Sequence, residues 1–415
     1  MSAPARTRSR MSQGEFIAMV AVLFATVAFS IDAMLPAMPE IAAELSPDAP
    51  NRGQFIVTSF VFGMGLGTLV VGPLSDAFGR KPLIIWGGVL YIIGAVAAYF
   101  AESLEVLLAA RVLQGLGAAG PRAVTIAIVR DLYAGRTMAK IMSFAMMIFA
   151  LIPAVAPMMG AGIIALSDWR GIFLAFIVFS IFSAGWVTLR QPETLPVEKR
   201  RPLNAGLLWS GVVEIFSNRM VVLTIAVLTL CFGMLFAALV STQPIFDETF
   251  DMNDSFPYWF AVIAVLSIGG SVTNARFVER LGMRYLVTVT LSVQIVLSGV
   301  MAAVCYMDLL PTDGLFWAYF LWTTSVFFMA GLTMGNLNAM AMEPLGHLTG
   351  LASSVVSSVA TVLAVAVAAP IGLAFDGTPA PVALGVAICA VIGVILTLIM
   401  GPGPRRQETT AQDTA

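Results

Sequence analysis

The sequence predicts an all-α membrane protein with 12 transmembrane helices in two pseudo-symmetric six-helix bundles. Three observations predict this fold: the composition, twelve long apolar stretches, and a charge pattern that alternates along the chain. The 415 residues are 59% hydrophobic and only 11% charged, whereas charged residues make up about a quarter of an ordinary soluble domain. The composition therefore excludes a typical soluble globular protein.

Twelve apolar stretches each approach the about 20 residues that a helix needs to cross about 30 Å of hydrocarbon. We expect these helices at residues 16–39, 53–75, 83–101, 104–129, 138–166, 170–189, 220–245, 256–278, 285–307, 315–341, 349–374 and 380–400. The first stretch is too long for the apolar core of a signal peptide, so we expect it to be a retained helix.

The connections between these stretches alternate in charge. Basic residues fall in every second connection, and the remaining connections are acidic, with Arg52 and Arg170 as their only basic residues. Short basic loops stay in the cytoplasm. We therefore expect a multi-pass protein of the bacterial inner (plasma) membrane with both termini in the cytoplasm.

The longest polar connection divides the twelve stretches into six and six. The expected domains are a cytoplasmic N-terminal tail, an N-terminal six-helix bundle, a cytoplasmic linker with an amphipathic helix, a C-terminal six-helix bundle and a cytoplasmic C-terminal tail, at residues 1–12, 13–190, 191–218, 219–400 and 401–415. The two halves of the chain are also similar in sequence. GPLSDAFGRKPL (72–83) in the first half has a degenerate counterpart in NARFVERLGMRYL (274–286) in the second. Such parallel repeats place the site of a secondary transporter between the bundles.

Several motifs resemble those of the major facilitator superfamily. GPLSDAFGRKPL is similar to its loop signature, and LLAARVLQGLGAAG (107–120) is similar to its fourth-helix motif. PAVAPMMGAG (153–162) resembles the fifth-helix antiporter motif, although Ala156 and Ala161 replace two of its glycines. The resemblance implies the major facilitator fold.

Four further segments resemble one branch of this superfamily, the bicyclomycin and chloramphenicol resistance branch of drug/proton antiporters with 12 spans. They are IDAMLPAMPEIAAEL (31–45), AIVRDLYAGRTMAK (127–140), PETLP (192–196) and STQ (241–243). The resemblance implies export of drugs in exchange for protons.

The loop motif is expected to act as a conformational switch on the cytoplasmic face. Its residues are Gly72, Asp76, Gly79, Arg80 and Lys81. The glycines allow a tight turn and a close approach of helix ends. Asp76 can pair with Arg80 or, as the family resemblance suggests, lie against the N-terminal dipole of the eleventh helix. The alternative is a solvated turn that only fixes the topology.

Three ionisable residues are expected inside the hydrocarbon: Asp32, Arg111 and Arg122. Each marks a candidate site, because a central charge costs about 2.5–3.5 kcal/mol. Asp32 is expected to carry the coupled proton, since changing hydration changes the protonation of a carboxyl group. The alternative is that Asp32 caps a backbone distorted by Pro36. The resemblance implies that Arg111 supports the proton site by pairing with Asp32 or by holding the first helix.

Arg122 lies three helical turns beyond Arg111, so it is expected to face the same route or to snorkel to the inner interface. The candidate substrate cavity contains Asp32, Gln114, Arg122, Met146 and Gln243. Two arginines facing the cavity favour neutral, zwitterionic or anionic substrates over dications. Methionines such as Met146 provide an adaptable apolar lining, although most are expected to face lipid or to pack.

A bend is expected in the fifth helix, because Pro153 and Pro157 remove backbone hydrogen bonds there. Gly160 follows them and permits close approach of another helix.

No cofactor, metal or nucleic-acid site is expected. The chain has one histidine, no cluster with metal-ligand spacing and no phosphate-binding loop. The net charge of −2 gives no nucleic-acid signature. The expected partners are a small-molecule substrate, protons and the lipid bilayer, and the protein is expected to be a monomer.

The sequence thus predicts a proton-coupled secondary transporter, not an enzyme, that exports small amphipathic compounds by alternating access. A proton symporter or uniporter that imports a metabolite has the same fold and remains an alternative. A membrane scaffold or receptor is a further alternative, but it would not need Asp32 and Arg111 in lipid.

Overall fold

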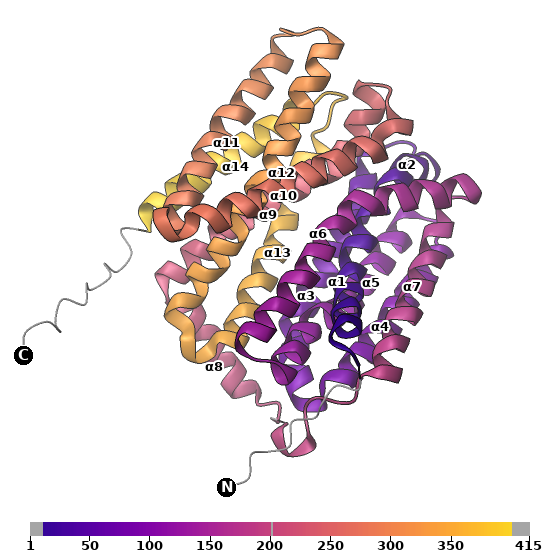
Figure 1. Ribbon diagram of the computed structural model, residues 1–415. Coiled ribbons are helices and arrows are strands. Elements are labelled where there is room, and N and C mark those ends of the chain that lie inside the picture. The colour runs from indigo at the N-terminus through magenta and orange to yellow at the C-terminus, as the bar shows by residue number, and fades with distance from the viewer. Residues whose placement is uncertain (1–10, 201, 401–415) are drawn as a thin grey trace, which may run out of the picture.

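The computed structural model describes residues 11–200 and 202–400, which form helices joined by short connections (Figure 1). In this part of the chain, twelve helical segments are long and apolar enough to cross a membrane. The predicted all-α fold with twelve membrane helices is therefore confirmed. The predicted tail at 401–415 and most of the one at 1–12 lie outside the described residues.

The N-terminal bundle contains the first six spans. Its helices are α1 (Gln13–Asp32), η1 (Leu35–Ala37), α2 (Met38–Leu45), η2 (Pro50–Gln54), α3 (Phe55–Phe78), α4 (Arg80–Tyr99), α5 (Leu104–Leu132), α6 (Gly135–Leu166) and α7 (Arg170–Arg190). The first apolar stretch is not the single helix that we expected at 16–39. It is broken after Asp32 and resumes as α2.

The C-terminal bundle contains the other six spans. Its helices are α9 (Arg219–Pro244), η4 (Ile245–Thr249), η5 (Asn253–Ser255), α10 (Phe256–Leu281), α11 (Met283–Tyr306), α12 (Thr312–Met342), η6 (Glu343–Leu348), α13 (Thr349–Leu373) and α14 (Ala380–Ile399). The connection between the bundles holds the short turn η3 (Val197–Lys199) and helix α8 (Ala205–Ser217), which lies against α9 and α13.

We name the two faces of the protein by their charge. The basic face is where α3 joins α4 and where α6 begins, with Arg80 and Arg136. The acidic face is where α2 leads to α3 and where α9 ends, with Glu44 and Asp247.

Glycines let α5 pack tightly between α3 and α4. A Cβ atom at Gly63 of α3 would collide with the backbone of Val112 in α5, and one at Gly117 of α5 would collide with the backbone of Tyr91 in α4. Small residues at such positions let helix backbones approach closely in membranes. The polar residues of α5 are thereby held in the centre of the bundle.

The two bundles meet along α3 with α13 and along α6 with α10, and Figure 1 shows α13 beside α3. Midway along the first of these seams, the Ser358 hydroxyl donates to the Gly65 carbonyl at 2.6 Å. At the acidic face, Gln54 Nε2 donates to the Gly372 carbonyl at 3.0 Å. At the basic end, a Cβ at Gly72 would lie 3.1 Å from Ser354 Oγ. The α3–α13 contact therefore extends through the whole depth of the membrane.

Candidate functional site

Arg111 is fully buried in the centre of the N-terminal bundle. Its Nε donates to the Ile56 carbonyl of α3 at 3.2 Å, its Nη2 to the Ser30 carbonyl of α1 at 2.8 Å, and its Nη1 to Gln114 Oε1 at 2.5 Å. The guanidinium carbon also lies 4.5 Å from the centre of the Phe60 ring, a favourable cation–π distance. The side chain thus holds the backbone of the first helix and makes no ion pair with Asp32.

The contact with Ser30 compensates for the break in the first span. In a continuous helix the Met34 amide would donate to the Ser30 carbonyl. Here it donates to the Ile31 carbonyl at 3.3 Å instead, which leaves the Ser30 carbonyl without its usual helical donor. Arg111 supplies the missing donor from a neighbouring helix.

Asp32 lies directly at this break, as the last residue of α1. Its side chain is buried, with 5% of the residue exposed. In residues 11–200 and 202–400 its carboxyl group has no hydrogen-bond or ion-pair partner, so it does not cap the distorted backbone beside Pro36. Asp32 lies roughly 30 Å along α1 from the basic face, at 1.5 Å per residue.

Helix α6 packs against the break. Ala33 is the first residue after α1. A Cβ atom at Gly160 would collide with its carbonyl group. Only glycine permits this approach. Pro153 and Pro157 lie inside α6, which runs as one helix through both prolines. The bend expected there stays a prediction.

Gln114 is fully buried beside Arg111, and its Nε2 has no partner in the described part of the chain. The Ser30 hydroxyl and the Tyr91 hydroxyl lie 2.6 Å apart next to it. Gln114 therefore belongs to a sealed polar cluster that links α1, α4 and α5.

Arg122 points toward the middle of the membrane. Its Nη1 lies 3.7 Å from the sulfur of Met64, which is the tenth of the 24 residues of α3, counted from the acidic face. The Arg122 side chain is accessible to solvent in the absence of lipid. A snorkelling arginine would instead extend toward the basic face.

Two further residues of the expected cavity come from other helices. Gln243 is buried at the acidic-face end of α9, where its Nε2 donates to Asn253 Oδ1 at 3.0 Å. Met146 is an exposed residue of α6. The structure therefore brings Arg111 and Gln114 together but separates Gln243 from them along the membrane normal.

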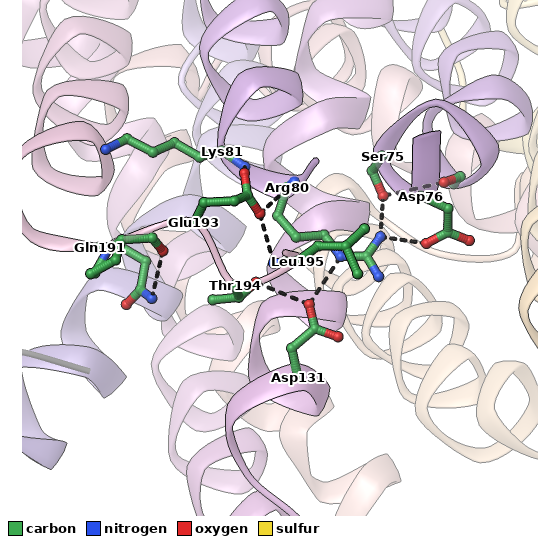
Figure 2. A network of polar contacts seen from close by, with 11 residues as sticks. Ser75, Asp76, Arg80, Lys81, Asp131, Gln191, Glu193, Thr194 and Leu195 are labelled. Atoms are coloured by element: carbon green, nitrogen blue, oxygen red, sulfur yellow. Dashed lines mark hydrogen bonds and ion pairs between the residues drawn. The ribbon is translucent and has the colours of Figure 1, made fainter. Parts of the chain in front are cut away.

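The loop motif forms an ion-pair network at the basic face (Figure 2). Arg80 Nη1 lies 2.5 Å from Asp76 Oδ1 and 2.6 Å from Ser75 Oγ, and its Nε donates to Asp131 Oδ2 at 3.0 Å. Gly79 makes the turn before Arg80 with φ of 106°, a conformation that favours glycine. Of the two contacts expected for Asp76, the structure contains the one with Arg80.

Glu193 completes this network and was missed from the sequence. Its carboxylate accepts the backbone amides of Arg80 and Lys81, each at 3.0 Å, and so caps the N-terminus of α4 (Figure 2). Lys81 Nζ in turn donates to the Thr188 carbonyl of α7 at 2.6 Å. The sequence did contain a sign of this role. Glu193 belongs to PETLP and Asp131 belongs to AIVRDLYAGRTMAK, two of the segments that resemble the drug/proton antiporters.

Comparison with known families agrees with this architecture. Residues 20–369 match the family model described as Major Facilitator Superfamily. The chain belongs to this superfamily. The family predicted from the loop and fourth-helix motifs is thereby confirmed.

The relatives include named drug-resistance proteins. A bicyclomycin resistance protein homolog of Haemophilus influenzae is 29% identical over 384 residues, which cover 92% of this chain and 94% of that protein. The chloramphenicol resistance protein of Pseudomonas aeruginosa is 35% identical over 185 residues, which cover 44% of this chain and 42% of that protein. Multidrug resistance protein MdtL of Escherichia coli is 33% identical over 202 residues, 48% of this chain and 50% of that protein. These names agree with the predicted branch.

Solved structures of low identity share the fold. The D-xylose–proton symporter superposes with a TM-score of 0.73 at 14% identity, covering 94% of this chain and 97% of that chain. The human organic anion transporter MFSD10 gives a TM-score of 0.62 at 16% identity, covering 94% of this chain and 100% of that chain. The predicted major facilitator fold is confirmed.

The Arg111 contacts generate a stability prediction. Arg111→Lys should lower the apparent unfolding temperature in detergent, because a lysine cannot reach the carbonyls of α1 and α3 and the Gln114 amide together. Each buried carbonyl left unpaired costs about 1–3 kcal/mol. The matched control is Arg136→Lys, because Arg136 is an exposed residue of α6. This substitution should leave the apparent unfolding temperature unchanged. Equal temperatures for both variants would contradict the bracing role of Arg111.

Proposed function

We propose that the protein is a proton-coupled secondary transporter that exports small amphipathic compounds by alternating access. Asp32 carries this proposal, because its carboxyl group is buried at the break of the first span with no partner. A buried carboxylate without a partner is costly, whereas its protonated form is not. Any motion that brings water to Asp32 therefore changes its proton occupancy.

The surrounding residues support coupling between this proton and a conformational change. Arg111 fixes α1 just before the break, and Gly160 places α6 against the residue just after it. Helix α6 also contacts α10 of the other bundle. A displacement between the bundles at the α6–α10 contact is therefore transmitted to the backbone beside Asp32.

The relatives support the proposed direction of transport, and Arg122 supports the proposed class of cargo. The relatives named above are resistance proteins, which favours export over import. The Arg122 guanidinium points toward mid-membrane from α5 and, unlike that of Arg111, is exposed. A positive charge there favours neutral, zwitterionic or anionic cargo, so we propose Arg122 as a cargo-selecting residue together with the apolar lining near Met146.

The charge pattern supports the orientation and location. The basic face should lie in the cytoplasm of a bacterium, with both termini on that side. We propose a monomer in the inner membrane that needs protons and a small-molecule substrate, with no cofactor, nucleic acid or enzymatic reaction.

The network around Arg80 supports a switch on the cytoplasmic side. Arg80 joins the end of α3, through Asp76, to the end of α5, through Asp131. Glu193 ties the same turn to the connection that leads to the C-terminal bundle. We propose that Gly72, Asp76, Gly79, Arg80 and Lys81 bias the conformational equilibrium through these contacts.

Asp32→Asn tests the coupling. The amide keeps the shape of the carboxyl group and cannot carry the proton, so proton-driven efflux should be abolished while the protein stays folded. Efflux of a compound panel from an efflux-deficient host, and substrate-driven proton release in proteoliposomes, measure the effect. Asp48→Asn, an exposed residue of the acidic face, is the control. Retained substrate-driven proton release in Asp32→Asn would remove Asp32 from the mechanism.

Asp76→Ala tests the switch. Loss of a half-exposed ion pair worth about 0.2–1 kcal/mol should shift the resting population toward the inward-open state by up to about fivefold. Paired labels at Lys140→Cys in α6 and Arg276→Cys in α10, with the three native cysteines replaced by serine, report the distance across the basic face. Asp313→Ala on the acidic face is the control. An unchanged distance distribution would favour a solvated turn.

Arg122→Ala tests cargo selection. A unit charge about 8 Å away contributes about 2 kcal/mol at an effective dielectric constant of about 20. Efflux of anionic compounds should therefore fall by roughly 30-fold, whereas matched cations lose no attraction and should not be weakened. Neutral polar compounds should also be weakened, and Arg122→Lys should retain most of the preference. Equal small losses for every compound in both variants would show that Arg122 does not select cargo.

A further inference from the structure

A groove lies on the outer surface of the N-terminal bundle at the basic face, between α1 and α7. Its volume is about 560 Å³, within the size range of small-molecule sites. Helix α7 packs against α1, α4 and α6, and Figure 1 shows it on the side of the N-terminal bundle remote from the C-terminal bundle. The groove therefore faces the surrounding lipid, and the proposed transport function does not use it.

A glycine opens the apolar part of this groove. Gly185 lies one helical turn from Ile181 and one from Leu189, two exposed residues that line the groove with it. Apart from the adjoining backbone of α7, no atom lies within 4 Å of the position of a Cβ at Gly185. The rings of Phe182 and Trp186, with centres 5.4 Å apart, form one wall. The groove thus contains an apolar slot where a side chain is missing.

One end of the groove carries two opposite charges. Arg190 Nε and Nη2 donate to Glu15 Oε1 and Oε2 at 2.7 and 2.9 Å. Arg190 Nη1 makes no hydrogen bond within the described part of the chain. A carboxylate has about four acceptor positions, of which Arg190 occupies two and the nearby Trp186 indole at most one. The ion pair therefore retains both donors and an acceptor for a ligand.

The groove is oriented like a phospholipid of the leaflet at the basic face. Arg190 is the last residue of α7 and Glu15 lies in the first turn of α1, so both charges lie where these helices reach the basic face. Trp186 is one turn deeper, at the level where tryptophans are enriched in membrane proteins. Ile181 is roughly 14 Å deeper than Arg190, at 1.5 Å per residue. The charged end therefore lies among the headgroups and the apolar slot in the hydrocarbon.

We propose that this groove binds one phospholipid with a primary ammonium headgroup, such as phosphatidylethanolamine. The phosphate accepts hydrogen bonds from Arg190 Nη1, and the ammonium group donates to Glu15. One acyl chain lies in the slot at Gly185, where it packs against the rings of Phe182 and Trp186. The two lipid charges and the two protein charges then alternate in sign.

This alternation of charge discriminates among lipids. A phosphatidylglycerol headgroup brings a phosphate to Arg190 but no positive charge to Glu15, so the carboxylate repels it. A phosphatidylcholine headgroup is zwitterionic, but its quaternary ammonium has no N–H donor for Glu15. Only the primary ammonium headgroup of these three satisfies both members of the ion pair.

Lipid titration of the delipidated full-length protein, followed by native mass spectrometry, tests this proposal. The probes are dioleoylphosphatidylethanolamine, dioleoylphosphatidylcholine and dioleoylphosphatidylglycerol. The first molecule of phosphatidylethanolamine should bind about fivefold more tightly than phosphatidylglycerol. It should bind about threefold more tightly than phosphatidylcholine, which keeps the phosphate contact. These factors are those of one or two exposed charge contacts.

Two variants test the two ends of the groove separately. Gly185→Leu fills the slot and leaves the ion pair intact, so it should weaken binding of phosphatidylethanolamine at least about fivefold. Its matched control is Gly299→Leu, because Gly299 is an exposed glycine of α11 that also has open space at its Cβ position. Glu15→Gln should abolish the preference for phosphatidylethanolamine over phosphatidylglycerol. Glu198→Gln, at an exposed position of η3, is its control and should preserve that preference.

Three outcomes would overturn the proposal. The first is equal affinity of the unmodified protein for the three lipids. The second is unchanged binding of phosphatidylethanolamine in Gly185→Leu. The third is a dimer that forms in the unmodified protein and is lost in Gly185→Leu, because a second copy of the chain would then cover the groove. Correct folding of each variant is checked by its elution profile in size-exclusion chromatography and by its apparent unfolding temperature.

Discussion

The arrangement of the N-terminal bundle depends on one buried arginine. Arg111 lies in the hydrocarbon region with no acidic partner, which is unfavourable unless its donors are satisfied. They are satisfied by carbonyls of α1 and α3 and by the Gln114 amide. Because the Ser30 carbonyl is available only where α1 stops being regular, the arginine and the break stabilise each other. Removing either would leave buried polar groups unpaired.

This mutual dependence places Asp32 in an unusual setting. The first span is interrupted next to a carboxyl group, and α6 closes over the interruption at Gly160. The backbone at this point is held by a side chain from α5 and by contact with α6. It is not held by the regular ladder of hydrogen bonds that makes other parts of a membrane helix rigid. A carboxyl group on such a segment responds to helix movement more readily than one in the middle of a regular helix.

Most of the fold could be predicted from the sequence because hydropathy and charge act locally. Spans of about 20 apolar residues and alternating basic loops indicate both number and order of the helices. The break after Asp32 was not predicted, although Pro36 lies close to it, because a proline in a membrane helix more often bends than interrupts it. The interruption is stabilised by Arg111, which lies about 80 residues away in the chain.

The candidate functional site was harder to predict than the fold, because its contacts join residues that lie far apart in the chain. The importance of Arg111 and Gln114 could be inferred from a charge in lipid and from the fourth-helix motif. Glu193 could not, since an acidic residue in a polar connection is usually solvated, and only the folded chain shows that it caps α4. Gln243 was expected near the other polar residues, but distance along the membrane normal depends on helix ends that sequence locates only within a few residues.

The seam between α3 and α13 has a consequence for the speed of transport. At Gly65 and Gly72 the surface of α3 carries no side chain, and α13 presents Thr361 and Val362 opposite Gly65 and Ser354 opposite Gly72. Interlocked large side chains must change rotamer before two helices can slide, and each such change adds to the activation barrier. At Gly65 and Gly72 the α3 side of the seam makes no such contribution, because it presents only backbone. Shear of α3 along α13 is therefore opposed by fewer rotamer changes at these two positions than it would be between two fully interlocked helices.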